Sequence, residues 1–138
     1  MNARFEFGEN FLEITNFIPY AKDAVGGNQY NTLFDLNVQS MGGKFMGVGD
    51  FEVDIKQFKQ FVSELEEMHA LKRGSVKLES FTPGEEQIEF IMEKTGQITV
   101  YGTITNFTHT MEFEFEADQT ALPTFIKDIK EILREYDL

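Results

Sequence analysis

The sequence contains no cysteine, which excludes both a disulfide framework and a metal site built from thiolates. It also contains no apolar run near the ~18 residues that a membrane-spanning helix requires. The N-terminal stretch MNARFEFGEN has no apolar core segment and no small-residue cleavage site, so we expect no signal peptide. These absences predict a cytoplasmic protein that has no membrane partner.

Positive charge is also scarce. The 12 Lys and Arg residues stand against 24 Asp and Glu, which gives a net charge of −12 and a pI near 4.5. Because nucleic acid binding depends on basic groups that release counterions from phosphates, we expect no nucleic acid partner. An acidic chain attracts a basic protein instead, and electrostatic steering accelerates their encounter. The alternative is that the negative charge serves only solubility.

What the sequence does contain is enough apolar material for a core. Of its 138 residues, 41% are hydrophobic and 15 are Phe. A chain of this length buries roughly two-thirds of its unfolded surface when it folds. No linker composition divides it, so we expect residues 1–138 to form a single acidic domain.

Alternating apolar and polar residues predict strands, and glycine pairs mark the turns between them. Gly47 and Gly49 lie inside one of these strands and indicate a bulge or the close approach of another backbone. Loops or turns are expected at 19–29 around Gly26–Gly27, at Gly42–Gly43, at Pro83–Gly84 and at Thr95–Gly96. The predicted strands are 4–7, 11–18, 30–40, 45–53, 76–80, 86–93, 98–107 and the alternating stretch that begins at His109.

Two segments have the apolar spacing of amphipathic helices. The first starts at Ile55, with Asp54 as N-cap, Gln57 completing a capping box and Gly74 as the stop signal. The second follows Asp118 or Thr120 as its cap, and Pro123 is tolerated in its first turn. Their buried stripes are Phe58, Phe61, Val62, Leu65, Met68 and Leu71, and then Leu122, Phe125, Ile129, Ile132, Leu133 and Tyr136.

The sequence therefore predicts an α+β fold. Consecutive hairpins favour antiparallel pairing, and each helix must bury its stripe against a sheet. We expect an antiparallel β-sheet of about seven to eight strands in two sets, with two α-helices packed on it. The order along the chain is β-β-β-β-α-β-β-β-β-α.

The second half places one kind of charge on one face of its strands. If the apolar residues face the helices, the period of two fixes the opposite face. That open face is acidic, and Tyr101 and Ile91 lie near its middle. Alternation alone is explained by a strand with one side in water. It does not explain why the charges share one sign, because a solvent-exposed face without a binding role usually carries both positive and negative charges. The expected open face consists of Lys77, Glu79, Glu89, Ile91, Glu93, Thr99, Tyr101, Thr103, Thr105, Glu112, Glu114 and Glu116.

Motifs for catalysis or for a cofactor are missing from the sequence. His69 and His109 lie apart and have no spaced partner, so we expect no metal site. The stretch GGKFMGVGD lacks the Gly-Lys-Ser/Thr order of a phosphate loop. We expect no enzyme activity, no catalytic residue and no cofactor. An unrecognised carboxylate site among the 24 acids is the alternative. Phe is usually a core residue, but partial exposure is the alternative for Phe17, Phe45, Phe81 and Phe107.

Several stretches together resemble the WapI-like immunity proteins, which are small bacterial proteins that protect a cell from the toxic domain of a secreted polymorphic toxin. The residues that carry the resemblance are FDLNVQSMGGKFMGVGDFEVDIKQFKQFVSELEEM, LESF with IEF, and GQITVYGTI with MEFEFEADQTALPTFIKDIKEIL. The resemblance implies inhibition of a cognate toxin domain, often a basic nuclease, by a stoichiometric complex.

Together with the charge of the open face, this resemblance gives a functional hypothesis. We expect Glu89, Glu93, Tyr101, Glu112, Glu114 and Glu116 to contact the toxin, with Glu64, Glu66 and Glu67 of the first helix as the alternative surface. We expect the protein itself to be a monomer or a weak homodimer. The alternative function is a general interaction or self-associating structural module that has no toxin partner.

Overall fold

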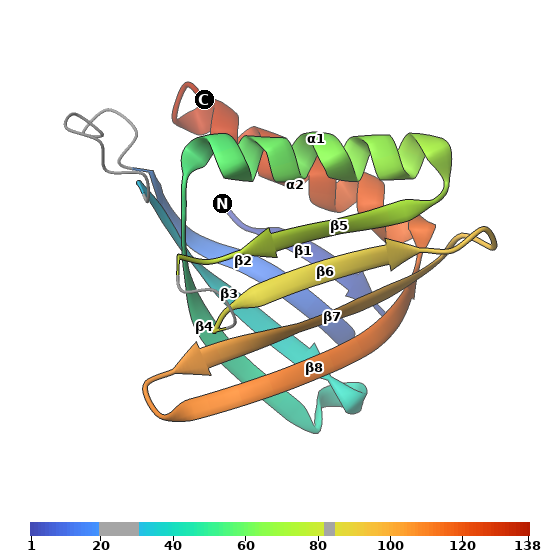
Figure 1. Cartoon of the computed structure of the whole chain (residues 1–138), viewed down its shortest axis with the longest axis horizontal. Coiled ribbons are helices and arrows are strands. Elements are labelled where there is room, and N and C mark those ends of the chain that lie inside the picture. Colours follow the sequence, from blue (N-terminus) through green and yellow to red (C-terminus); the bar gives the residue numbers. More distant parts are fainter. Residues whose placement is uncertain (20–30, 82–84) are drawn as a thin grey trace.

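A computed structural model describes residues 1–19, 31–81 and 85–138 of the chain (Figure 1). It contains two four-stranded antiparallel sheets, each with its strands in sequence order. The predicted α+β fold and its element order are confirmed. Sheet A holds β1 (Ala3–Phe7), β2 (Asn10–Pro19), β3 (Thr32–Ser40) and β4 (Phe45–Val53), and is followed by α1 (Ile55–Leu71). Sheet B holds β5 (Gly74–Glu79), β6 (Gln87–Met92), β7 (Gln97–Asn106) and β8 (His109–Asp118), and is followed by α2 (Leu122–Glu135).

The two helices lie across one end of the molecule, and the tips of the β3–β4 and β7–β8 hairpins lie at the opposite end (Figure 1). Helix α1 packs along β5 and α2 packs along β1, so each helix borders the edge strand of one sheet. The sheets approach each other directly where β4 meets β7. One hydrophobic cluster joins both sheets and both helices.

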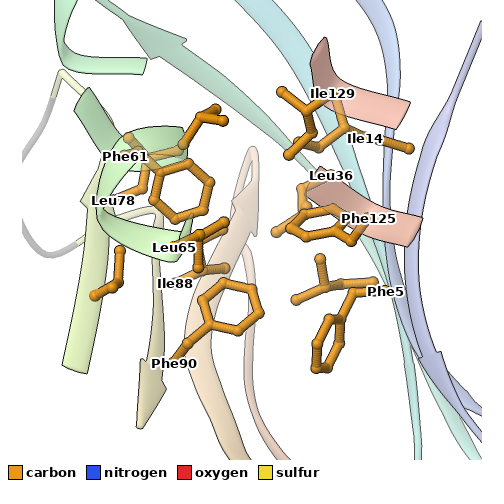
Figure 2. Packing of buried hydrophobic residues seen from close by; sticks show 14 of the residues in the cluster. Phe5, Ile14, Leu36, Phe61, Leu65, Leu78, Ile88, Phe90, Phe125 and Ile129 are labelled. Atoms are coloured by element: carbon orange, nitrogen blue, oxygen red, sulfur yellow. The ribbon is translucent and has the colours of Figure 1, made fainter. Parts of the chain in front are cut away.

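Phenylalanines connect these elements in the core. The ring of Phe5 on β1 lies 5.2 Å from that of Phe90 on β6 and 5.8 Å from that of Phe125 on α2, both edge to face. Figure 2 shows the side chains of both sheets and both helices pointing toward this centre. Edge-to-face pairs add roughly 0.5–1.5 kcal/mol to the hydrophobic gain from burial. The inward side chains of sheet B therefore form part of the core, and its outer face is open.

The prediction that Gly47 and Gly49 permit a close approach is confirmed. A Cβ atom on Gly49 would lie 2.6 Å from the Cβ of Ile104 on β7, a separation that real side chains do not adopt. A Cβ on Gly47 would lie 3.0 Å from the Sδ of Met111 on β8. The two glycines thus allow β4 to pack directly on sheet B.

The start of α1 partly matches the prediction. Asp54 is the N-cap, and its carboxylate accepts a hydrogen bond from the Lys56 N–H at 2.9 Å. The predicted capping box is wrong, because the Gln57 side chain donates to the backbone carbonyl of Glu79 at 3.0 Å instead. The Ile55 N–H in the first turn of α1 has a different partner. It donates a hydrogen bond to the side-chain Oδ1 of the buried Asn31 at 2.9 Å.

The predicted stop of α1 at Gly74 is also wrong. Lys72 adopts the left-handed conformation (φ +58°) that ends the helix, and Gly74 already belongs to β5. At the second helix, Asp118 caps a short 3-10 turn, Gln119–Ala121, through the Thr120 N–H. Helix α2 then starts at Leu122 and accommodates Pro123 in its first turn, as predicted.

Most predicted strands are present within two or three residues of their expected ends. Phe107 lies in the turn after β7 rather than in the strand, and Glu93 lies in the turn after β6. The β3–β4 connection includes a 3-10 turn, Met41–Gly43. The predicted loop at Gly26–Gly27, the start of a strand at Tyr30 and the Pro83–Gly84 turn lie outside the described residues.

Candidate protein-binding surface

The outer face of sheet B is the face that the sequence predicted. The inward-facing apolar residues of β5 to β8 are buried, except Met111, which is half-buried beside Gly47 and not fully in the core as predicted. Their alternating neighbours lie on the outer face of sheet B, which is turned toward the viewer in Figure 1. We use the name acidic face for the part of this surface that carries Glu89, Tyr101, Glu112, Glu114 and Glu116.

Strand register brings these five residues together. Tyr101 on β7 pairs with Glu89 on β6 on one side and with Glu114 on β8 on the other. Glu112 and Glu116 flank Glu114 along β8, opposite threonines of β7. Adjacent strands lie about 4.8 Å apart, so the two carboxylates flank one tyrosine ring at close range. Glu93, the sixth predicted contact, is exposed in the turn after β6. Its backbone N–H donates a hydrogen bond to the backbone carbonyl of Gln97.

The phenol of Tyr101 is held by these carboxylates. A hydrogen bond with the Glu89 carboxylate raises the pKa of Tyr101 above its usual value of 10.0, and the negative charge of Glu114 adds to the effect. The hydroxyl therefore stays protonated in the physiological range and points its donor toward an acid.

A shallow hollow of about 430 Å³ opens beside the tyrosine. Gly102 and Phe113 form part of its lining. A Cβ on Gly102 would collide with the carbonyl oxygen of Gln87, so the glycine is required by the sheet itself. The remaining lining residues are Gln87, Tyr101, Thr103, Glu112 and Glu114, so three of the six predicted contacts border this hollow.

The glutamates of the acidic face are not neutralised within the described part of the chain. The salt bridges found there join Arg4 to Glu6 and Glu13, Lys77 to Glu79, and Lys130 to Glu66. None of them involves Glu89, Glu112, Glu114 or Glu116. The hollow is therefore bordered by carboxylates that have no cationic partner among residues 1–19, 31–81 and 85–138.

The alternative surface on α1 is different. Glu66 is paired with Lys130 of α2 at 2.6 Å, and the Glu64 carboxylate accepts a hydrogen bond from Gln60. Glu67 is exposed. Two of these three acids are thus engaged within the helix layer, whereas the glutamates of β8 point freely outward.

A second acidic group, which the sequence analysis missed, lies on β3 and β4. Asp35 and Asp50 are direct cross-strand partners, and their hydrogen bond raises the pKa of Asp50, with burial and the charge of Asp35 as further causes. Glu86 lies near them. Burial is the main cause of its raised pKa, against the hydrogen bond that Thr105 donates at 2.6 Å. A signal existed, because a hairpin that turns at residues 41–44 pairs position 35 with position 50.

Exposed apolar residues form another group, for which the sequence analysis had named partial exposure of four phenylalanines only as an alternative. Of the four phenylalanines that the sequence left as either buried or partly exposed, three are exposed and Phe17 is buried. The exposed ones are Phe45 (57%), Phe81 (51%) and Phe107 (100%). Two of the three exposed ones lie on the β3–β4 and β7–β8 hairpins, at the end of the molecule away from the helices (Figure 1). We call this group the apolar end, and it consists of Met41, Phe45, Met46, Val48 and Phe107.

Within residues 1–19, 31–81 and 85–138, neither helix has the length and hydrophobicity needed to cross a membrane. In the same ranges, no group of three or more His, Asp or Glu residues is arranged to hold a metal ion.

Comparisons with known proteins give a fold and a family. The chain is similar to one in the crystal structures of Trypanosoma bruciei MRP1/MRP2, with a TM-score of 0.53 over 99% of this chain and 84% of that chain. At 14% identity this likeness concerns the fold alone. No curated protein matches the sequence. The model of the immunity protein WapI-like family matches residues 8–137, so the chain belongs to the WapI-like immunity protein family.

Proposed function

We propose that this immunity protein binds a cognate bacterial toxin domain through its acidic face and inhibits it in a stoichiometric complex, without catalysis of its own. The partner we propose is a basic domain, a nuclease in particular. The observation that carries this proposal is the row of glutamates around Tyr101 on the outer face of sheet B, none of which is in a salt bridge within the described residues. Family membership supports the coarser role of an immunity protein with a toxin partner.

The cost of the acidic face supports a binding role. Glu112, Glu114 and Glu116 repeat every second residue along β8, which places their Cα atoms about 6.8 Å apart. This separation is shorter than the electrostatic screening length, which is about 10 Å at 0.1 M salt. The carboxylates therefore still repel each other. A surface that keeps such repulsion in the free protein gains from a cationic partner, which removes it on binding.

The hollow beside Tyr101 suits the end of a cationic side chain. Its volume of about 430 Å³ exceeds what one Lys or Arg side chain occupies, and Glu112 and Glu114 supply the acceptors. Tyr101 lies between Glu89 and Glu114 in the strand register, so an incoming cation meets an aromatic ring flanked by two carboxylates. A nuclease site that binds phosphate carries such cations, and the acidic face then occupies the place of the nucleic acid.

Co-expression with the toxin domain encoded by the gene immediately upstream tests the proposal. We expect the wild-type protein to protect the cell and to purify in a one-to-one complex. The double variant Glu112→Lys, Glu114→Lys should bind more slowly and with a weaker salt dependence, because steering charges act on the association rate. The matched control is Glu64→Lys, Glu67→Lys on α1.

Each outcome has a separate meaning. A slower association for the β8 variant, with the α1 control unchanged, supports the acidic face. If the α1 variant associates more slowly and the β8 variant is unchanged, the interface lies on α1. If the wild-type protein neither protects the cell nor forms a complex with that domain, the proposed function is wrong.

A further inference from the structure

Phe107 has a conformation and an exposure that the fold does not explain. It lies in the two-residue turn between β7 and β8, next to the closing pair Asn106 and His109, and adopts φ +55°. Tight hairpin turns of this kind favour Asn or Gly, because a left-handed conformation brings the Cβ of other residues too close to the backbone. The Phe107 side chain is 100% exposed, so it gains no burial in return.

The other hairpin at this end of the molecule repeats the arrangement. Met41, in the β3–β4 turn, adopts φ +54° and is 62% exposed. Two left-handed residues with large apolar side chains thus lie at the two tips opposite the helices (Figure 1). A conformational outlier that the native fold does not reward is a reason to look for function at that position.

The apolar end is connected along β4. The Asn106 side chain beside Phe107 donates to the carbonyl oxygen of Val48 at 3.5 Å, which places the β7–β8 tip against the middle of β4. Val48 and Met46 follow on the outer face of β4, 41% and 69% exposed, and Phe45 is exposed where the strand begins at the other tip. The surface is therefore larger than an isolated exposed side chain.

The apolar end also adjoins the acidic face. Thr103 pairs with Glu112, and three register positions further along the same hairpin Asn106 pairs with His109 at the tip. At about 3.4 Å per residue, the tip lies about 10 Å from the edge of the hollow. A protein domain that covers the hollow is large enough to reach Phe107.

The charges around the apolar end indicate its partner. Asp50 and Glu52 continue the outer face of β4 beyond Val48, and Glu112 lies on the side of β8, whereas Lys44 in the β3–β4 turn is the cation nearest in sequence. A second copy of this chain would bring the same acids and the same net charge of −12 against them. A basic protein with an apolar pocket complements both the acids and the apolar side chains.

We propose that Phe107, together with Met46 and Val48, inserts into an apolar pocket of the toxin domain and determines how long the complex lasts. The inference rests on the proposed function and adds a second contact area to it. Aromatic side chains that fill a partner's pocket dominate the dissociation rate, whereas charges at the rim act mainly on association.

The variant Phe107→Asn separates binding from folding. Asn is favoured in a left-handed turn position, so the thermal midpoint of the free protein should not fall. Dissociation from an inactivated form of the toxin domain encoded upstream should accelerate by at least about tenfold, with little change in the association rate. Met46→Ser should act in the same direction, and Leu71→Asn, an exposed apolar residue at the far end of α1, is the matched control.

An unchanged dissociation rate for both Phe107→Asn and Met46→Ser overturns the inference, while binding by the wild-type protein leaves the proposed function intact. If the wild-type protein does not bind that domain, the proposed function fails first and the inference falls with it. If instead the free wild-type protein dimerises and Phe107→Asn abolishes the dimer, the occupant is a second copy and not the toxin.

Discussion

At the residue scale, the pair of Asp35 and Asp50 is the clearest case of a contact that costs stability. Their carboxyl groups face each other across β3 and β4, and the hydrogen bond with Asp35 is the largest cause of the raised pKa of Asp50. Asn16 holds Asp35 in place by donating to its Oδ2 at 2.7 Å. The folded protein therefore binds a proton here more tightly than the unfolded chain does.

The upward direction of this pKa shift predicts how Asp50→Asn changes stability. Above the raised pKa both carboxylates are charged, and the pair destabilises the fold. The variant should then be more stable than the wild type at neutral pH by roughly 0.2–1 kcal/mol, the range for cross-strand pairs. As the pH falls through the raised pKa toward the ordinary value of 3.8, the wild type gains a proton and the difference disappears.

Chemical denaturation at a series of pH values measures this difference. Glu135→Gln, at an exposed position at the end of α2, removes one negative charge elsewhere and should show a much smaller gain at neutral pH. If Asp50→Asn has the same stability as the wild type at neutral pH, the two aspartates do not repel each other in solution.

At the element scale, the contact between β4 and β7 depends on glycine. The variant Gly49→Ala should destabilise the protein by about 1–3 kcal/mol, because its Cβ would lie 2.6 Å from the Cβ of Ile104 and 3.3 Å from the Cα. Gly47→Ala is the control, since its nearest neighbours are the ends of side chains, Met111 Sδ at 3.0 Å and Ile104 Cδ1 at 3.1 Å. Thermal unfolding should place it between the wild type and Gly49→Ala. Equal midpoints for the two variants would contradict a tight approach of β4 to β7 at Gly49.

The same scale shows where sequence patterns stop being informative. The alternation of β6, β7 and β8 predicted the residues of the acidic face, because a period of two leaves no choice once the core side is known, whereas Glu93, predicted on the same face, lies in the turn after β6. The ends of α1 were less predictable. Gln57 is drawn to the Glu79 carbonyl, and Asn31, a residue far away in the sequence, satisfies the Ile55 N–H. Such partners depend on the tertiary arrangement and leave no local pattern.

At the scale of the whole molecule, the element order was readable but the joining of the two sheets was not. Gly47 and Gly49 indicated a close approach, yet nothing in the sequence named Ile104 as the neighbour. The apolar end was unpredictable for a similar reason. Phe is usually buried, so the sequence left exposure of Phe45 and Phe107 only as an alternative, and the fold decides it by placing both residues on hairpins that project away from the core.

The net charge of −12 leads to a prediction for the molecule as a whole. Neutralising the three β8 glutamates together (Glu112→Gln, Glu114→Gln, Glu116→Gln) should raise the thermal midpoint of the free protein in low salt, because three neighbouring carboxylates repel each other. The gain in thermal midpoint should shrink in high salt, because the screening length falls to about 3 Å at 1 M and the carboxylates then repel each other less. The same variant should associate more slowly with the toxin domain, so one surface would trade stability for binding.

A matched variant separates local repulsion from total charge. Glu64→Gln, Glu67→Gln, Glu135→Gln also removes three negative charges, but from the two helices, and none of these acids is in a salt bridge within the described residues. If repulsion along β8 matters, the β8 variant gains more stability in low salt than the helix variant. Equal gains would mean that the glutamates of the acidic face act only through the net charge. In that case solubility, and not recognition of a basic partner, would explain why they share one sign.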